Sequence, residues 1–331
     1  MTTLKDRSID NCRFSATDSS GRYEVRPERY NSDCWTGTKK ILLTGASGFL
    51  GHLVKAKLEN DGHEVWGLDL QECLPERIIG ADLCDEQSVA SALESIPPCD
   101  FIVHTAALAH GQNLKSGETY AGVNSSMTRN LIRALPWDIP PIIFFSSVAV
   151  YGEANRFQPV APDAELSPST DYGVGKKDCE AFLKESADTV LALRLSPVYD
   201  DSHLKDVRKR VFFPVLPMKM RIIPNPSYSL THSSVVADEV ARLASRDSFP
   251  PGFHVVNLAD ELPHSQEELR KRFPGPTLPV PLMLIRPFLF LFKLLPRKIG
   301  CKFQCLFHKL FFSNVYKGHS KNYPATESRT T

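Results

Sequence analysis

The sequence lacks the features that mark several special classes of protein. Its 331 residues include 39 lysines and arginines against 38 aspartates and glutamates, so the net charge of +1 gives no reason to expect nucleic acid as a partner. None of the eight cysteines forms a CxxC pair, and Cys301 and Cys305 have no histidine partners at zinc-finger spacing. We therefore expect a reduced, cytoplasmic protein with no structural metal.

The sequence also shows no targeting segment. Residues 1–38 are polar, include several acidic residues and contain no apolar core, which argues against a secretory signal and a mitochondrial transit peptide. Their composition predicts a disordered extension, and a partner-binding arm is the alternative.

Acidic residues are absent from a long stretch near the other end. Pro279 to Phe312 contains no Asp or Glu, and its almost wholly apolar part, Leu282–Leu295, is too short to cross a bilayer. We predict two helices packed on the rest of the chain. The alternative is that residues 282–312 lie peripherally on an anionic membrane surface, because apolar side chains with flanking cations bind there.

From Lys39 onward, short apolar runs alternate with helical patterns. Strands are predicted at Ile41–Thr44, Glu64–Leu70, Phe101–Thr105, Ile142–Ser147 and Val190–Leu195, with a weakly marked strand near Ile78–Ile79. Helices are predicted at Phe49–Asn60, Glu86–Ser95, Val123–Leu135 and Tyr172–Ser186. This alternation predicts an α/β fold with a doubly wound parallel sheet covered on both faces.

The pattern changes after about Ser196. Prolines become dense and the apolar runs irregular, which predicts a smaller C-terminal substrate-binding lobe over residues 197–331. The first domain is expected over residues 39–196. A helix at Ala237–Ser245 and a strand at His254–Asn257, near 237–258, are expected to return to it.

A glycine-rich turn follows the first predicted strand. Gly45, Gly48 and Gly51 are spaced GxxGxxG and lead directly into a helical pattern. Such a turn lets the backbone approach a pyrophosphate, which the free N–H groups at the helix start then face. Asp69 closes the second strand at the usual distance, where a carboxylate binds the adenosine ribose and repels a 2′-phosphate. The pattern predicts NAD rather than NADP.

Two further pairs of residues stand where a dinucleotide would pass. Asp82 and Leu83 follow the weak third strand, although Asp82 fits a helix cap equally well. Ala106 and Ala107 end the fourth strand with small side chains, which suits either a close cofactor or simple close packing.

Tyr172 and Lys176 lie four residues apart on a predicted helix, so both side chains leave one face. A free tyrosine has a pKa of about 10 and is a poor base near neutrality. A neighbouring ammonium group and an oxidised nicotinamide ring would both favour the phenolate. Ser147, at a strand end, could orient the reacting oxygen by a hydrogen bond. The three residues predict proton transfer coupled to hydride transfer.

Taken together, these motifs resemble the extended short-chain dehydrogenase/reductase family, in its NAD-dependent epimerase/dehydratase branch. The resemblance extends from about Lys39 to Arg242 and rests on TGASGFLG, Asp69, ADL, HTAA, VN, SSVAVYG, YGVGK and DEVA. It implies a Rossmann-type domain followed by a substrate lobe, and a homodimer.

The resemblance also assigns roles to residues by motif position. It implies that Ser147, Tyr172 and Lys176 are catalytic. The expected cofactor contacts, including the whole glycine turn, are Gly45, Ser47, Gly48, Phe49, Leu50, Gly51, Asp69, Asp82, Leu83, Ala106, Ala107, Asn124, Tyr172 and Lys176.

The sequence departs from the family pattern at two places that bear on the substrate. Nucleotide-sugar enzymes of this family often carry RPxNVYGP, where this chain has Arg194-Leu195-Ser196-Pro197-Val198-Tyr199-Asp200. They also often carry an arginine for the diphosphate where residues 228–234 have none. Candidates for that charge are Arg208, Lys209, Arg210 and Arg221, unless they form a solvated basic loop.

The leading hypothesis is an NAD-dependent oxidoreductase or isomerase that acts on a nucleotide-sugar, as an epimerase or a 4-keto-sugar reductase. An apolar alcohol, as for hydroxysteroid dehydrogenases, is the alternative substrate. A third hypothesis is a dinucleotide-sensing scaffold without turnover, which the intact Ser147, Tyr172 and Lys176 set argues against.

Overall fold

The computed structural model describes residues 37–109, 114–152, 158–213, 218–284, 305 and 307–318. The predicted extension therefore lies outside the described residues except for its last two positions, and so does most of the stretch 285–306.

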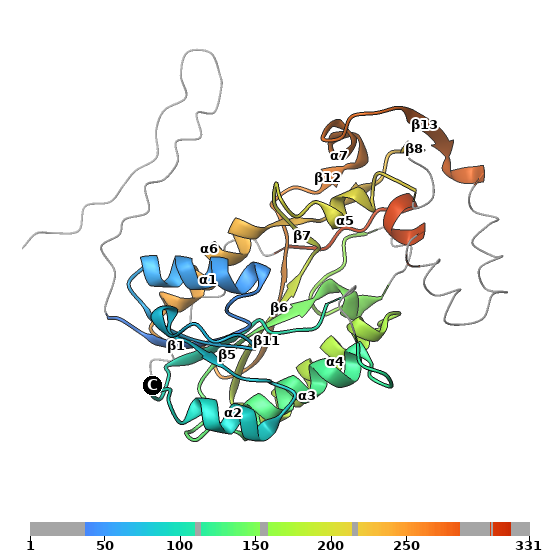
Figure 1. Ribbon diagram of the computed structural model, residues 1–331. Coiled ribbons are helices and arrows are strands. Elements are labelled where there is room, and N and C mark those ends of the chain that lie inside the picture. Colours follow the sequence, from blue (N-terminus) through green and yellow to red (C-terminus); the bar gives the residue numbers. More distant parts are fainter. Residues whose placement is uncertain are drawn as a thin grey trace, which may run out of the picture. The chain divides into compact units, whose positions relative to one another are not determined.

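In the described part of the chain, seven parallel strands form one sheet in the order β11-β6-β5-β4-β1-β2-β3 (Figure 1). They are β1 Lys40–Thr44, β2 Glu64–Asp69, β3 Ile78–Gly80, β4 Phe101–His104, β5 Ile142–Ser147, β6 Thr189–Leu195 and β11 Gly252–Leu258. The apolar runs form buried strands because helices cover both faces of the sheet. This confirms the predicted α/β fold.

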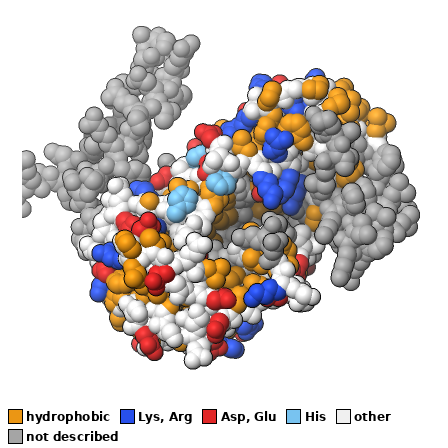
Figure 2. All heavy atoms as spheres, in the orientation of Figure 1, with side chains coloured by type: hydrophobic (Ala, Val, Ile, Leu, Met, Phe, Trp, Pro, Cys, Tyr) orange, Lys and Arg blue, Asp and Glu red, His pale blue; other side chains and the backbone are white. Residues whose placement is uncertain are grey.

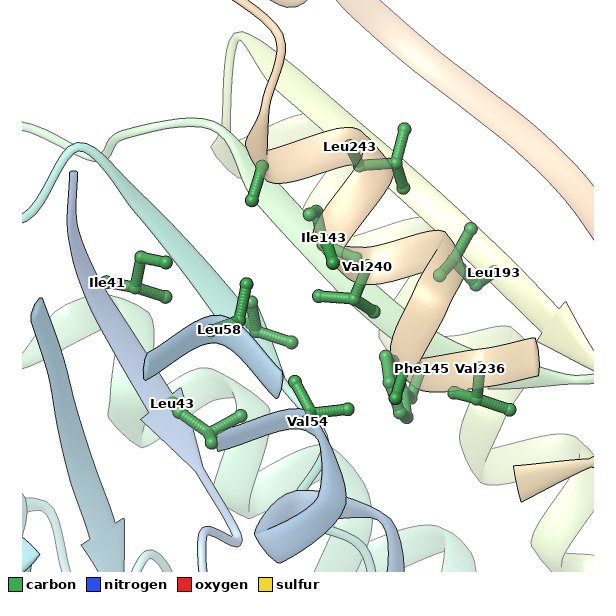
Figure 3. Packing of buried hydrophobic residues seen from close by; sticks show 14 of the residues in the cluster. Ile41, Leu43, Val54, Leu58, Ile143, Phe145, Leu193, Val236, Val240 and Leu243 are labelled. Carbon is green, nitrogen blue, oxygen red and sulfur yellow. The ribbon is translucent and has the colours of Figure 1, made fainter. Parts of the chain in front are cut away.

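Two groups of helices sandwich the sheet. One face is covered by α1 (Phe49–Asn60) and α6 (Ser233–Ala244), whose contacts with strand residues such as Ile143 and Leu193 are seen in Figure 3. The other face is covered by α2 Glu86–Leu93, α3 Tyr120–Arg133 and α4 Asp171–Ser186. Full burial of each Val, Leu or Ile side chain in these layers contributes roughly 1.5–3 kcal/mol.

Polar side chains fix where α2, α3 and α4 begin. Thr119 accepts a hydrogen bond from the backbone N–H of Gly122, so α3 begins at Tyr120 and not at the predicted Val123. Thr170 caps α4 in the same way through Gly173. Asp85, not Asp82, caps α2, which removes the helix-cap interpretation of Asp82.

Smaller elements complete the chain after β6. Two parallel pairs join β7 (Val198–Tyr199) to β10 (Thr231–His232) and β8 (Lys219–Ile223) to β13 (Thr277–Pro281). An antiparallel pair joins β9 (Ser227–Tyr228) to β12 (His264–Ser265). The helices α5 Lys205–Arg208 and α7 Gln266–Lys271 also follow β6, whereas the 3-10 turns η1 Leu74–Glu76 and η2 Val148–Tyr151 precede it.

The apolar C-terminal stretch divides between core and surface. Phe307, Leu310, Phe311 and Phe312 are buried in a cluster with Met220 and Ile222. Met283 and Leu284 instead expose 83% and 66% of their surface, so only the start of the stretch presents apolar surface among the described residues. No helix in the part of the chain that the structure describes is long and apolar enough to cross a membrane.

Candidate active site

The glycine turn lies at the point where the strand order reverses. β1 pairs with β2 on one side and with β4 on the other, and ligands of such sheets bind beyond the carboxyl ends of the strands at this point. Gly45 has φ +70°, and a Cβ there would lie 2.9 Å from the backbone of Ala106. A Cβ on Gly51 would lie 1.9 Å from the carbonyl oxygen of Gly45. Larger residues at either position would collide with the backbone, so the glycines keep the turn tight and the helix close to the strand, as a dinucleotide-binding turn requires.

Asp69 is held against the turn at the end of β2. Its Oδ2 accepts a hydrogen bond from the backbone N–H of Ser47 at 2.8 Å, and its Oδ1 accepts one from Leu70 at 2.7 Å. The two amides fix the plane of the carboxylate while its other lone pairs remain for a ligand. This arrangement fits the ribose hydroxyls of NAD.

Four more predicted cofactor residues lie around the same edge of the sheet and differ in how far their side chains are exposed. Asp82 is exposed after β3, and its Oδ1 accepts from Cys84 N–H at 2.9 Å. The Leu83 side chain is buried, so only its backbone can face a ligand. Ala106 and Ala107 are half-buried after β4, beside Gly45.

The side-chain amide of Asn124 bonds to the backbone of the protein itself. It is buried on α3, and its Oδ1 and Nδ2 bond to the backbone N–H and carbonyl of Leu108 at 2.7 and 3.1 Å. Its amide therefore shapes the loop after β4.

The structure brings two of the three predicted catalytic residues into contact. Ser147 ends β5 and is half-buried, and its side chain forms a hydrogen bond with that of Tyr172, the second residue of α4. The Ser147 hydroxyl also accepts from Ala149 N–H at 3.2 Å. Because β5 is parallel to β4 and β1, this pair lies at the same edge of the sheet as the glycine turn.

The amine of Lys176 bonds to the backbone of β5 rather than to the phenol oxygen of Tyr172. Its Nζ donates to the carbonyl oxygen of Phe145 at 2.6 Å and stands 4.7 Å from the ring centroid of Phe144. The distance to the Tyr172 ring centroid is 6.0 Å. Burial lowers the pKa of Lys176 to about 8, so the amine is still mostly charged at neutral pH.

Burial also governs Tyr172, in the direction opposite to the sequence expectation. It raises the pKa of Tyr172 to about 12, and the hydrogen bond from Ser147 opposes that rise. The protein alone therefore keeps the phenol protonated, because desolvation of the phenolate is the largest influence and the charges of Cys179 and Asp206 act in the same direction.

A side-chain contact that the sequence did not suggest joins the glycine turn to the loop after β7. The ring of His203 stacks on that of Phe49 with centroids 3.9 Å apart and an interplanar angle of 26°. Asp200 accepts hydrogen bonds from the backbone and from Nδ1 of His203. Phe49 is therefore packed by the protein itself, whereas Leu50 packs partly against the core below it.

The four candidate cations after β7 occupy different surroundings. Arg210 is buried, lies over the Tyr228 ring and donates to the carbonyl of Asp206 at 2.6 Å. Its Nε has no hydrogen-bond partner among the described residues. Lys209 pairs with the Asp206 carboxylate at 2.7 Å. Arg208 instead stacks on Phe212 and Phe273, and Arg221 is exposed on β8.

Burial is the main cause of the raised pKa of Tyr172, and the charge of Asp206, which bonds to Lys209 and Arg210, adds to it. Figure 2 shows basic and histidine side chains on the two sides of a hollow in the surface. Within the described ranges, no three His, Cys, Asp or Glu side chains are grouped so that they could hold a metal.

A family model and several curated proteins match part of this chain. Residues 41–212 match the model of the NAD dependent epimerase/dehydratase family. A Bacillus subtilis protein described as an uncharacterized UDP-glucose epimerase, YtcB, is 30% identical over 198 residues, which are 51% of this chain and 59% of that protein. The UDP-glucose 4-epimerase of Vibrio cholerae is 28% identical over 205 residues, which are 59% of this chain and 61% of that protein.

Solved structures share the fold. A short-chain dehydrogenase/reductase superfamily protein from Agrobacterium tumefaciens, solved with bound NAD, gives a TM-score of 0.58 at 22% identity, over 80% of this chain and 96% of that chain. At this identity the likeness establishes the fold alone.

Proposed function

The chain belongs to the NAD dependent epimerase/dehydratase family, and on that premise we propose that it binds NAD and interconverts a secondary alcohol and a ketone on a nucleotide-linked sugar. The observation that carries the proposal is the hydrogen bond between Ser147 and Tyr172 at the sheet edge where the glycine turn lies. A scaffold without turnover has no need of this contact.

The protein's part in binding follows from the cradle. The amides at the start of α1 and the glycine turn would hold the pyrophosphate, and Asp69 would accept hydrogen bonds from the adenosine ribose. Lys176 would hold the nicotinamide ribose. NAD, when bound, supplies the hydride acceptor and donor and, in its oxidised form, a positive charge near Tyr172.

The proton is moved by Tyr172. Ser147 donates a hydrogen bond to the reacting oxygen and holds it near the phenol. Tyr172 then accepts the hydroxyl proton during oxidation and returns it during reduction. Because the protein, chiefly through burial, raises the pKa of Tyr172 to about 12, the base forms only when the site is loaded and positive charge offsets that rise.

The substrate class is inferred from the relatives and from charge. The curated relatives described above carry the names of UDP-glucose epimerases, and Arg210, whose Nε has no hydrogen-bond partner among the described residues, is the candidate cation for a substrate phosphate. The chain covers about three fifths of those two proteins, so we propose the class, epimerase or 4-keto-sugar reductase, and not one sugar. An apolar alcohol is the alternative, which the buried cation disfavours.

A substrate panel tests the proposal. UDP-sugars, 4-keto sugars and sterols are incubated with NAD, and the absorbance of the reduced cofactor is followed together with product stereochemistry. Epimerisation predicts an inverted carbinol with no net reduction, and a reductase predicts stoichiometric use of reduced cofactor. Turnover confined to sterols, or none across the panel, would contradict the proposal.

The proposal includes two partners, a second copy of the chain and an anionic membrane surface. We propose a homodimer, which sedimentation velocity tests. We also propose that the stretch 282–312 contacts anionic membranes peripherally. Among its described residues, the exposed Met283 and Leu284 are the candidates for this contact, because Phe307, Leu310, Phe311 and Phe312 are buried in the core. Co-sedimentation with phosphatidylglycerol vesicles tests it, and a Met283→Ser, Leu284→Ser variant should lose any binding.

A further inference from the structure

A turn that follows β7 reaches across to the start of α1. Residues 200–203 form this turn, the β7 turn. The ring of His203 stacks on that of Phe49, the first residue of α1, with centroids 3.9 Å apart and planes inclined by 26°. Aromatic pairs in such contact attract each other beyond the burial of their surface. The His203 side chain still exposes 52% of its surface, so the stack lies on the outside of the glycine turn and is not part of the core.

The β7 turn is held in shape by one carboxylate. Oδ1 of Asp200 accepts hydrogen bonds from the backbone N–H groups of Ser202 and His203 at 2.8 and 2.7 Å, and from the Ser202 hydroxyl at 2.8 Å. The same oxygen lies 3.0 Å from Nδ1 of the His203 ring. Aspartates commonly close turns by bonds to the backbone that follows them. The direction of the ring toward Phe49 is therefore set within the turn itself.

The β7 turn starts from a buried and hydrogen-bonded residue. Tyr199, which precedes it, is buried, and its hydroxyl donates to Oδ2 of Asp260 at 3.0 Å. Oδ1 of Asp260 accepts from the backbone N–H of His232 at 2.7 Å, and His232 stands opposite Tyr199 in the β7–β10 pair. The turn thus joins this anchored strand to the start of α1, two parts of the chain about 150 residues apart.

The contact with Phe49 lies midway along the expected cofactor. A dinucleotide at this edge of the sheet would extend from Asp69, which ends β2, to Ser147, which ends β5. β1 lies between those strands, and its glycine turn leads directly to Phe49. The N-cap residue of α1, Gly48, makes no side-chain hydrogen bond to the helix, so the first amides remain available for the pyrophosphate. The β7 turn therefore lies beside the expected pyrophosphate position.

We propose that the β7 turn is a lid over the pyrophosphate part of the NAD site, closed by the stack of His203 on Phe49. His203 is a positioning residue in this role, because it acts through Phe49 and not on the reacting atoms. Loops that close over a ligand often limit the rate at which it leaves. The inference rests on the proposed function for the binding of NAD. It favours the epimerase within that proposal, because a retained cofactor can be reduced and reoxidised in one turnover.

The experiment measures the binding and release of NADH by the full chain in stopped-flow fluorescence, without any sugar. The stack joins two protein side chains, so its loss should lower the barrier to entry and to exit alike. In His203→Ala, we expect both rate constants to rise roughly three- to tenfold, with the dissociation constant within about twofold of the wild type. Asp200→Ala, which frees the His203 ring, should change both rate constants in the same direction.

Two further variants separate the lid from general effects. His203→Phe keeps an aromatic ring against Phe49 and should return both rate constants to within about twofold of the wild type. His254→Ala removes a half-buried histidine near the start of β11, at the opposite edge of the sheet, and should leave both rate constants unchanged. Thermal unfolding of each variant confirms that it is folded.

Unchanged rate constants in folded His203→Ala would overturn the inference. Faster release with an unchanged association rate would also overturn it, because His203 would then be a direct contact of the cofactor and not part of a lid. Fast exchange in His203→Phe would exclude stacking as the closing contact. A chain that binds no NADH would contradict the proposed function as well, so the two failures can be told apart.

Discussion

The Nζ of Lys176 and the carbonyl oxygen of Phe145 form a hydrogen bond of 2.6 Å, two residues before Ser147 on β5. The bond places a buried cation under the end of the strand, where it acts on both the stability of the chain and the chemistry of the site. Its charge is maintained at the cost of desolvation, since burial lowers the pKa of Lys176 to about 8.

Because burial lowers the pKa of Lys176, the difference in free energy of unfolding between Lys176→Met and the wild type should change with pH. Between pH 8 and about 10.5 the unfolded chain holds one proton more than the folded wild type, so wild-type stability rises with pH across this window. The advantage of Lys176→Met over the wild type should therefore shrink by about 2–3 kcal/mol from pH 7 to 10.5. Urea unfolding at each pH measures it.

Lys184→Met is the matched control, because Lys184 is exposed on the same helix. Its difference from the wild type should stay flat over the range. A flat difference for Lys176→Met as well would mean that the buried amine is not deprotonated in the folded state.

Asp69→Asn is expected to change cofactor selectivity. The variant loses the charge that accepts from Ser47 N–H and from ribose hydroxyls, so NAD affinity should fall by roughly tenfold. NADP should lose less, because the repulsion of its 2′-phosphate is relieved. Calorimetric titrations with both dinucleotides measure the ratio.

Asp100→Asn serves as the control for Asp69. Asp100 also accepts from a backbone amide, that of Lys40 at 2.7 Å, but lies before β4 at the opposite edge of the sheet. Equal losses of NAD affinity in both variants would show that Asp69 acts only through general stability.

Gly51→Ala is expected to damage the glycine turn. The added Cβ would lie 1.9 Å from the Gly45 carbonyl oxygen, so the turn must move and the free energy of unfolding should drop by about 2–4 kcal/mol. Gly318→Ala, where a Cβ meets nothing within 4 Å, should behave like the wild type. Thermal unfolding with and without NAD separates lost stability from lost binding.

His104 should make the fold sensitive to acid. The ring bonds to Thr44 Oγ1 at 2.7 Å and to Thr128 Oγ1 at 3.0 Å, and burial lowers its pKa to about 3. Below about pH 6.5 the unfolded chain gains a proton that the folded chain does not, so stability falls by up to about 1.4 kcal/mol per pH unit. His104→Gln should flatten that slope in urea unfolding, whereas exposed His52→Gln should not.

Much of the sheet domain could be predicted because its signals are local. Phe49–Asn60 and Ile142–Ser147 have the predicted bounds, since a glycine turn and an uninterrupted apolar run define their ends. The predicted family and fold class are confirmed. The start of α3 was wrong by three residues because the Thr119 cap is one hydrogen bond, which leaves no periodic trace.

The missed features of the site depend on residues far apart in the sequence. Lys176 bonds to Phe145, and His203 stacks on Phe49, across separations that no local pattern encodes. The buried ion pair between Glu180 and Arg194 did leave a signal, because an arginine inside the apolar strand VLALRL demands a buried counter-charge. The raised pKa of Tyr172 also depends on burial, which the spacing of a tyrosine and a lysine cannot report.

The account depends most on the phenol oxygen of Tyr172. The decisive measurement is turnover and NAD affinity in Tyr172→Phe, with the sugar that the substrate panel identifies. We predict a loss of turnover of at least about 100-fold with an NAD dissociation constant within about twofold of the wild type, because only the proton carrier is removed. A Tyr172→Phe enzyme that turns over at close to the wild-type rate would contradict the account.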